Sequence, residues 1–340
     1  MNTITIKTLA EKLQVSVATV SKALKDSHEI SIETKERVRK MAIALNYVPN
    51  LYASSLRKRK SNTIAVVLPE VADSYFSLAI NGIESIAQKK GYHVLIYLTH
   101  ENHQKQEAIL NDFKSGRVDG VLMSTTAETT DYSHVRELQN SGIPVVFFDR
   151  VCEDIETAKI TTNDFECGHL AGKHLVQQGC KKIAFLSISS SLSMSNKRAE
   201  GFHRALEDEH IKYKPTDIVN CKNDEQYNQA LIKKLLLKKQ RPDGIIASVE
   251  KLTTSVYLIC KELGLAIPGD IKVVSFSNQV SAPILNPSLT TITQPAFDMG
   301  AIAATILFKA LAKPGFNLKK ESVVIPSQLV ERDSTRVEGR

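Results

Sequence analysis

Residues 16–22 bring together side chains of the types that read DNA, because small apolar groups, hydroxyls and a cation follow one another closely. Val17 and Ala18 can contact the methyl group of thymine, and Lys22 can donate to O6 or N7 of guanine. Hydroxyl and backbone N–H groups suit phosphate oxygens. The hydroxyls here are those of Ser16, Thr19 and Ser21. The pattern predicts a segment that contacts both bases and phosphates.

Three predicted helices within residues 5–47 would position these side chains. Apolar residues recur at i, i+3 and i+4 spacing in three groups, which are Leu9, Ala10 and Leu13, then Val20, Ala23 and Leu24, then Val38, Met41, Ala42 and Leu45. Ser16 and Ser31 precede the second and third groups at capping positions. Because only residues 14–16 separate the first two helices, the pattern predicts a helix-turn-helix, whose second helix enters the major groove.

The distribution of charge supports a polyanionic partner for this segment. The chain has 340 residues and a formal net charge of +7. Residues 1–60 hold 12 Lys and Arg against 5 Asp and Glu, whereas residues 61–340 hold 32 of each. The excess indicates a small basic module joined to a larger neutral domain. A helical protein-interaction module with a solvated basic face is the alternative.

Nothing in the sequence predicts secretion or a membrane span. Residues 1–7 lack the continuous apolar segment of a signal peptide, and the uncharged stretch 299–308 is too short to cross a bilayer. The cysteines at positions 152, 167, 180, 221 and 260 form no Cys-x-x-Cys pair. Such a set suits reduced thiols better than disulfides or a zinc site. We therefore expect a soluble cytoplasmic protein.

From residue 61 onward, strand-like apolar runs such as Ile64–Leu68 alternate with helical patterns such as Phe76–Lys90. This alternation indicates parallel sheets flanked by helices, and the number of elements suits two α/β lobes. The cleft beyond the carboxyl ends of the strands is the expected ligand site. No Gly-x-Gly-x-x-Gly, Gly-Lys-Ser/Thr, Gly-x-Ser-x-Gly or His-Glu-x-x-His motif is present. The sequence therefore predicts no enzyme activity, no cofactor and no metal site.

Residues 6–24, IKTLAEKLQVSVATVSKAL, closely resemble the headpiece of the lactose/galactose repressor (LacI/GalR) family, as does LNYVPN at 45–50. Similar landmarks are IAVVLP at 64–69, RVDGV at 117–121, RAEGF at 198–202, LTTITQP at 289–295 and ERDST at 331–335. The resemblance thus covers essentially the whole chain. The usual Arg of the family's Val-Ser-Arg motif is Lys22 here. Since Lys lacks the bidentate fork of Arg, we expect softer base discrimination at this position.

The resemblance implies a DNA-binding transcriptional repressor that binds a pseudo-palindromic operator as a homodimer. It implies a helix-turn-helix headpiece at 1–48, a hinge at 49–60 and a ligand-sensing core at 61–340. In the family the hinge folds on the operator and inserts a leucine into the minor groove, although residues 49–60 alone could be a flexible tether. The expected DNA contacts outside the second helix are Thr5, Asn50, Ala53, Leu56 and Arg57.

The resemblance also implies an α/β core of two parallel-sheet lobes, similar to periplasmic binding proteins. Lobe 1 would span about 61–160 and 291–321, and lobe 2 about 161–290 and 322–335. The positions that match the family's effector contacts are Asp73, Tyr75, Phe76, Asp149, Arg150, Asn163, Arg198, Asn223, Glu250 and Asn278. Carboxylates, guanidinium groups and amides beside an aromatic face suit a polyol.

The sequence departs from the family at two places in this set. The family's usual Asn-Asp pair is Val249-Glu250 here, and its Phe-Asp-Asp is Phe276-Ser277-Asn278. These changes leave the sugar class open, so that a phosphorylated sugar, an amino sugar or a non-sugar ligand is permitted. A sugar-binding receptor without a DNA function is one alternative, which the basic headpiece opposes. An α/β enzyme with an accessory DNA-binding domain is another, which the missing catalytic motifs oppose.

Overall fold

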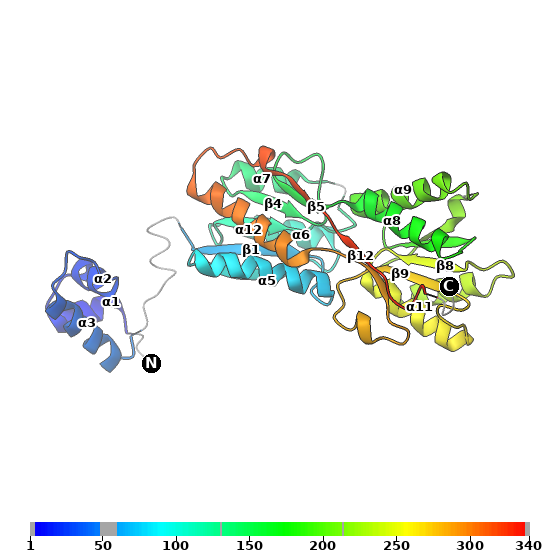
Figure 1. Ribbon diagram of the computed structural model, residues 1–340. Coiled ribbons are helices and arrows are strands. Elements are labelled where there is room, and N and C mark those ends of the chain that lie inside the picture. The colour runs from blue at the N-terminus through cyan, green and yellow to red at the C-terminus, as the bar shows by residue number, and fades with distance from the viewer. Residues whose placement is uncertain (1–3, 48–59, 130, 213, 337–340) are drawn as a thin grey trace. The chain divides into compact units, whose positions relative to one another are not determined.

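The computed structural model describes residues 4–47, 60–129, 131–212 and 214–336 (Figure 1). The chain divides into two compact units, residues 1–59 and residues 60–340. Nearly all of the predicted hinge lies outside the described residues. The DNA contacts expected of Asn50, Ala53, Leu56 and Arg57 therefore stay sequence-based predictions.

The first unit contains three helices, α1 (Ile6–Leu13), α2 (Val17–Leu24) and α3 (Ile32–Ala44). A hydroxyl precedes each helix and accepts a hydrogen bond from the backbone N–H three residues on, which caps the helix. The buried core consists of Leu9, Ala10, Leu13, Val20, Ala23, Val38 and Ala42. The predicted helix-turn-helix and its apolar stripes are confirmed.

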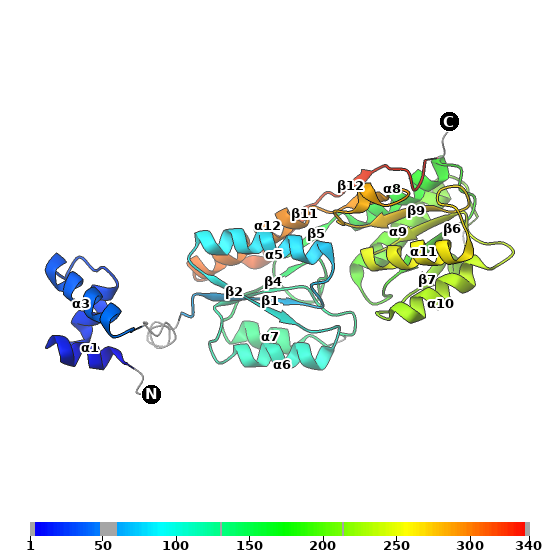
Figure 2. The same ribbon diagram turned by 90° about the horizontal axis from the view of Figure 1, so that it is seen from below.

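The second unit begins with a six-stranded parallel sheet in the order β11-β5-β4-β3-β1-β2. Its strands are β1 (Thr63–Leu68), β2 (His93–Leu98), β3 (Gly120–Met123), β4 (Val145–Phe148), β5 (Lys159–Thr162) and β11 (Val323–Ile325). Figure 2 shows that two helices cover each face of this sheet. They are α5 (Ser74–Lys89) and α12 (Ala296–Ala312) on one face, and α6 (His103–Phe113) and α7 (Ser133–Asn140) on the other. Because β3 and β4 are buried along their whole length, their apolar runs show no alternation.

A second six-stranded sheet has the order β12-β10-β9-β8-β6-β7 and is parallel except for β12, which pairs antiparallel with β10. Its strands are β6 (Ile183–Ser187), β7 (Ile218–Asn220), β8 (Gly244–Ala247), β9 (Lys272–Phe276), β10 (Thr290–Thr293) and β12 (Gln328–Val330). The helices are α8 (Asp164–Gln177) and α9 (Ser193–Asp208) on one face, and α10 (Glu225–Leu236) and α11 (Glu250–Leu263) on the other. Short 3₁₀ turns lie at Pro215–Asp217, Ala282–Ile284 and Leu318–Glu321. The predicted core of two parallel-sheet lobes is confirmed, whereas the antiparallel edge strand was not foreseen.

The chain crosses between the lobes three times, from β5 to α8, from β10 to α12 and from β11 to β12. These crossings fall a few residues after the expected positions 160, 290 and 322. Strand β10 belongs to the second sheet and β11 to the first, so the expected lobe bounds need correction at 291 and 322. The physical reason is that each of these strands completes its sheet ladder before the chain leaves the lobe.

Glycines allow one helix pair in each lobe to come very close. A Cβ built on Gly168 of α8 would lie 2.0 Å from the carbonyl oxygen of Arg198 on α9. A Cβ built on Gly201 of α9 would lie about as close to the carbonyl oxygen of Phe165 on α8. In the first lobe, a Cβ on Gly82 of α5 would lie 2.0 Å from the carbonyl oxygen of Phe297 on α12. The close contact of α8 with α9 fixes the backbone from which Arg198 projects.

Candidate functional site

The predicted base-reading residues stand at the start of α2. Ala18 and Lys22 are exposed, whereas Val17 is partly packed against the headpiece core. Ser16 Oγ accepts from the backbone N–H of Thr19 at 3.0 Å and lies 2.8 Å from its hydroxyl, so both side chains take part in the cap of α2. The hydroxyl of Thr5 caps α1 in the same manner.

Lys22 forms an ion pair with Glu29, which lies between α2 and α3. The two side chains are 49% and 52% exposed. Exposed pairs of this kind contribute only about 0–1 kcal/mol to stability. Lys22 can therefore leave Glu29 for a guanine at small cost.

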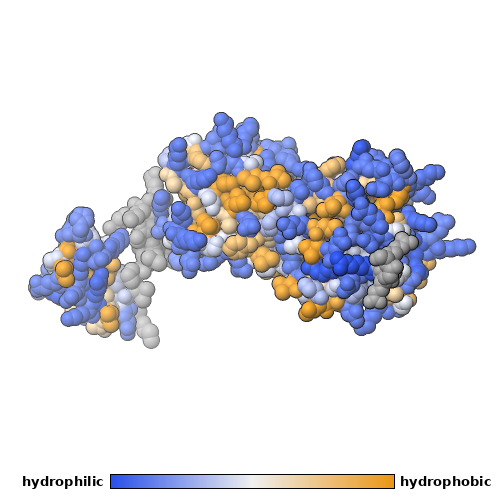
Figure 3. Space-filling model, viewed as in Figure 1, coloured by the Kyte–Doolittle hydropathy of each residue, from blue (hydrophilic) through white to orange (hydrophobic). Residues whose placement is uncertain are grey.

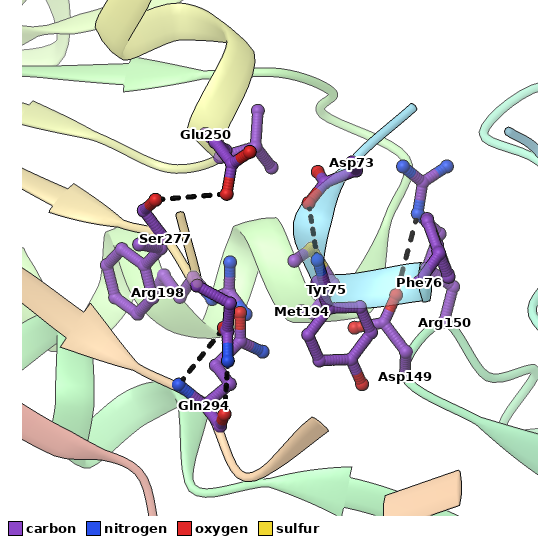
Figure 4. A pocket seen from close by; sticks show the side chains of 13 residues that line it. Asp73, Tyr75, Phe76, Asp149, Arg150, Met194, Arg198, Glu250, Ser277 and Gln294 are labelled. Atoms are coloured by element: carbon purple, nitrogen blue, oxygen red, sulfur yellow. Dashed lines mark hydrogen bonds and ion pairs between the residues drawn. The ribbon is translucent and has the colours of Figure 1, made fainter. Parts of the chain in front are cut away.

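A cavity lies between the lobes, lined by residues of both (Figure 4). Eight of the ten predicted effector contacts line it, namely Asp73, Tyr75, Phe76, Asp149, Arg150, Arg198, Glu250 and Asn278. Five further lining residues were not predicted, and these are Met194, Val249, Phe276, Ser277 and Gln294. The strands and helices that end at this edge thus converge on one space, as expected for parallel sheets.

Asn163 and Asn223 do not line this cavity, which corrects their expected place. Asn163 Oδ1 accepts from the backbone N–H of Ser327 at 2.8 Å, so it joins two of the segments that cross between the lobes. Asn223 Oδ1 accepts from Lys251 Nζ at 2.6 Å and faces neighbouring hollows. Asn163 directly follows β5 and Asn223 lies between β7 and α10, but local hydrogen bonds hold both side chains outside the cavity.

Arg198 is the most buried charged side chain of the cavity, with 1% of its surface exposed. Its Nε donates to Asp164 Oδ1 at 2.7 Å, and its Nη1 donates to the carbonyl of Ser248 at 2.7 Å. The guanidinium carbon lies 4.1 Å from the ring centre of Phe276. Nη2 is buried and has no partner in the described part of the chain.

Arg150 lies between two carboxylates. Its Nη1 donates to Glu101 at 2.6 Å, and its Nε lies 3.9 Å from Asp149. Burial lowers the pKa of Arg150, but the charges of Glu101 and Asp149 outweigh it and leave that pKa raised. Burial raises the pKa of Asp149 to about 6, although Arg150 and Arg198 oppose this. Asp149 also adopts a left-handed backbone with φ 61°, a strained conformation that often marks functional positions.

Asp73 and Glu250 face the cavity from opposite lobes (Figure 4). Asp73 caps α5 by accepting from the N–H of Tyr75 at 3.0 Å. Burial, together with the charges of Glu250 and Glu70, raises the pKa of Asp73 to about 6. Glu250 accepts from the hydroxyl of Ser74 at 2.7 Å, so it forms a hydrogen bond between the lobes.

Gln294 is a lining residue that the sequence reasoning missed. It directly follows β10, so the rule that strand ends meet at the ligand edge could have found it. Its side-chain Nε2 is buried and has no partner among the described residues. Asn278 donates to the backbone carbonyl of Gln294 at 2.6 Å and thereby holds this segment in place.

One family model matches within each of the two units of the chain. Residues 5–50 match the bacterial regulatory proteins of the lacI family, and residues 173–335 match a periplasmic binding protein-like domain. A ribose operon repressor of Halalkalibacterium halodurans is 30% identical over 333 residues, which cover 98% of this chain and 97% of that protein. The chain belongs to the LacI family. The resemblance seen in the sequence is confirmed.

Solved structures agree with this LacI-family assignment. The lac repressor dimer bound to operator and the anti-inducer ONPF matches with a TM-score of 0.84 at 22% identity, over 98% of this chain and 99% of that chain. A LacI-family regulator from Enterococcus faecium with bound ribose matches with a TM-score of 0.71 at 26% identity, over 80% of this chain and 98% of that chain. This LacI-family chain is a DNA-binding transcription regulator, and its family consists of regulators.

Two properties of the described residues concern membranes and metal ions. None of the helices there is long and apolar enough to cross a membrane. The same residues contain no group of three or more His, Cys, Asp or Glu side chains that could hold a metal ion.

Proposed function

We propose that this LacI-family regulator is a repressor whose affinity for operator DNA changes when a small sugar or sugar derivative binds between its lobes. Two buried donors carry the proposal, because Arg198 Nη2 and Gln294 Nε2 have no partner among the described residues and belong to side chains that line the cavity. An unsatisfied buried donor costs about 1–3 kcal/mol. Ligand oxygens placed at these two nitrogens would remove that cost.

The remaining lining residues suit the same class of ligand. Asp73, Asp149 and Glu250 offer acceptors for hydroxyl groups, and Tyr75 and Phe76 offer apolar surface to the C–H face of a sugar ring. Only about 20 Å³ between these side chains admits the centre of a water-sized sphere, so the lobes must part before a sugar can enter. The Enterococcus regulator with bound ribose supports a sugar as the effector.

For the DNA, we assign base contacts to Val17, Ala18 and Lys22. The phosphate contacts in this proposal are Thr5, Ser16, Thr19 and Ser21, and the hinge contacts are Asn50, Ala53, Leu56 and Arg57. A single headpiece makes few contacts, so useful specificity requires two headpieces on a pseudo-palindromic operator. The regulator acts by binding and not by catalysis, and it works in the cytoplasm.

Exposed hydrophobic side chains on the core favour a homodimer. Phe297 of α12 is 46% exposed, and Val280 and Ile284 are 86% and 83% exposed. Figure 3 shows hydrophobic surface on the face of the first lobe that carries α5 and α12. Contiguous exposed apolar surface usually marks an interaction site. A second copy of the chain would cover it.

Hydrogen bonds and ion pairs between the lobes provide the two-state element that a ligand can bias. Glu250 accepts from Ser74, and Lys251 Nζ lies 2.7 Å from Glu70 of the first lobe. A ligand bound by both lobes favours this closed arrangement over an open one. In the dimer, the closed and open arrangements would hold the two headpieces at different spacings.

Operator binding measured by fluorescence anisotropy tests the proposal. DNA selected from a random pool should bind the full chain, and the affinity should fall steeply with salt because lysines and arginines displace counterions. Lys22→Ala should weaken binding, whereas Lys238→Ala on the core should not. Addition of at least one sugar should change the operator affinity. Salt-independent binding, or indifference of Lys22→Ala, would refute the DNA part, and indifference to every sugar would refute the effector part.

A further inference from the structure

Carboxylates outnumber cations around the cavity. The five carboxylates are Asp73, Glu101, Asp149, Asp164 and Glu250, and the two guanidinium groups are Arg150 and Arg198. Glu101 lies 2.6 Å from Arg150 and Asp164 lies 2.7 Å from Arg198, and neither of these two acids lines the cavity. Each guanidinium group therefore already forms an ion pair with a carboxylate that lies outside the cavity lining. Three carboxylates remain that face the ligand space.

Two of these three carboxylates, Asp73 and Glu250, have no cation paired with them in the described chain. Their hydrogen bonds come from neutral groups, which are the Tyr75 N–H and the hydroxyls of Ser74 and Ser277. The cation next in sequence, Lys251, is bound to Glu70 and Asn223. Asp149 differs from these two, because Arg150 Nε lies 3.9 Å from it. Burial, together with the charges of Glu250 and Glu70, raises the pKa of Asp73, which agrees with a carboxylate that has no ion pair.

The opposite part of the cavity requires acceptors and not an anion. Arg198 Nη2 and Gln294 Nε2 are unpartnered, although their side chains are only 1% and 7% exposed. Asp164 occupies Nε of Arg198 and the Ser248 carbonyl takes one N–H of Nη1, so the side-on fork of Nε and Nη2 that grips a phosphate or carboxylate is not available. One free N–H₂ suits a hydroxyl or a ring oxygen. A metal ion does not fit the acidic side, because the described residues offer no suitable group of three ligands.

We propose that the effector of this cavity is an amine-bearing polyol, such as an amino sugar, with its hydroxyls at Arg198 and Gln294 and its ammonium group beside Asp73 and Glu250. This inference rests on the proposed function and specifies its ligand class. A sugar phosphate would bring an anion toward three carboxylates. A neutral sugar would leave Asp73 and Glu250 uncompensated, whereas an ammonium group has three N–H donors and the required charge.

Calorimetric titration of the full chain with matched ligands tests the inference. Glucose, galactose and mannose are each compared as the neutral sugar, the 2-amino sugar and the 6-phosphate at neutral pH. At least one amine should bind about tenfold or more tightly than its neutral parent, because hydrogen bonds between charged groups are roughly twice as strong as neutral ones. None of the 6-phosphates should bind. Glu250→Gln should reduce the preference for the amine, and Glu209→Gln, an exposed carboxylate on the same lobe, should leave it unchanged.

Three results would overturn the inference. They are a 6-phosphate that binds, a neutral parent that binds as tightly as its amine in every series, and an amine preference that Glu250→Gln leaves intact. Operator anisotropy on the same samples separates the two proposals. If a neutral sugar alters operator affinity, only the inference that the effector carries an amine is contradicted. If no ligand alters operator affinity, the effector part of the proposed function is contradicted.

Discussion

Replacement of Asp73 by Asn removes a buried charge and keeps a helix cap. Asp73 Oδ1 accepts from the N–H of Tyr75 at 3.0 Å, and the amide oxygen of Asn can accept the same bond. Burial, and then the charges of Glu250 and Glu70, raise the pKa of this carboxyl from 3.8 to about 6 in the folded chain. The folded state therefore holds the proton of Asp73 more tightly than the unfolded state does.

The sign of the effect on stability follows from this difference. Between pH 3.8 and about 6 the folded chain binds more protons at this site, so its free energy of unfolding falls as the pH rises through that window. A shift of about 2 units corresponds to about 3 kcal/mol. Because Asp73 is partly exposed, solvent screening reduces this to roughly 1–2 kcal/mol. Asp73→Asn should therefore stabilise the core by about that amount near pH 8 and by almost nothing below about pH 4.

Urea unfolding followed by circular dichroism near pH 8 and near pH 4 measures the difference. Asp224→Asn is the matched control, because Asp224 caps α10 through the N–H of Tyr227 at 3.0 Å and is exposed. The control should change stability little at either pH. If Asp73→Asn lowers the stability near pH 8, or raises it equally at both pH values, the argument from buried charge fails.

Three further substitutions test other parts of the account. Arg198→Met should weaken ligand binding by about 1.5–3 kcal/mol, because a charged hydrogen-bond donor is lost. Calorimetry measures this loss, and anisotropy should show that operator binding without ligand is unchanged. Gly168→Ala should destabilise the core by roughly 1–3 kcal/mol in urea unfolding and also weaken ligand binding. Gly82→Ala is its control, because it introduces the same 2.0 Å clash in the other lobe but should leave Arg198, and therefore ligand binding, in place. Lys22→Ala should cost about 1–3 kcal/mol of operator affinity, but Glu29→Gln, which frees Lys22, should cost none.

Local patterns in the sequence predicted the headpiece and the edge at which the cavity lies, and the family resemblance supplied most of the cavity residues. The stripe of Leu9, Ala10 and Leu13 depends only on helical periodicity, and it is buried as expected. Asp149 follows a buried strand, and parallel strands bring their carboxyl ends to one edge, so its place at the cavity also followed from the pattern. The family resemblance supplied Arg198.

Tertiary contacts decide the features that the sequence did not reveal. Glu101 pairs with Arg150 because its backbone is left-handed, with φ 60°, and no periodicity signals that conformation at a non-glycine residue. Met194 lines the cavity from the first turn of α9 and belongs to the same core cluster as Ile188 and Leu192. Asn163 has the expected position in the chain, but its side chain is bound to a segment more than 160 residues later, at Ser327.

The central claim is that the cavity and the operator site are coupled. Thermodynamic linkage requires the coupling to be reciprocal. The tightest ligand of the matched panel should change operator affinity by some factor, and saturating operator should change the affinity for that ligand by the same factor. Anisotropy and calorimetry on the full chain give the two factors under one buffer condition. Equal factors different from one are the predicted result, and a ligand that binds the cavity but leaves operator affinity unchanged would contradict the account.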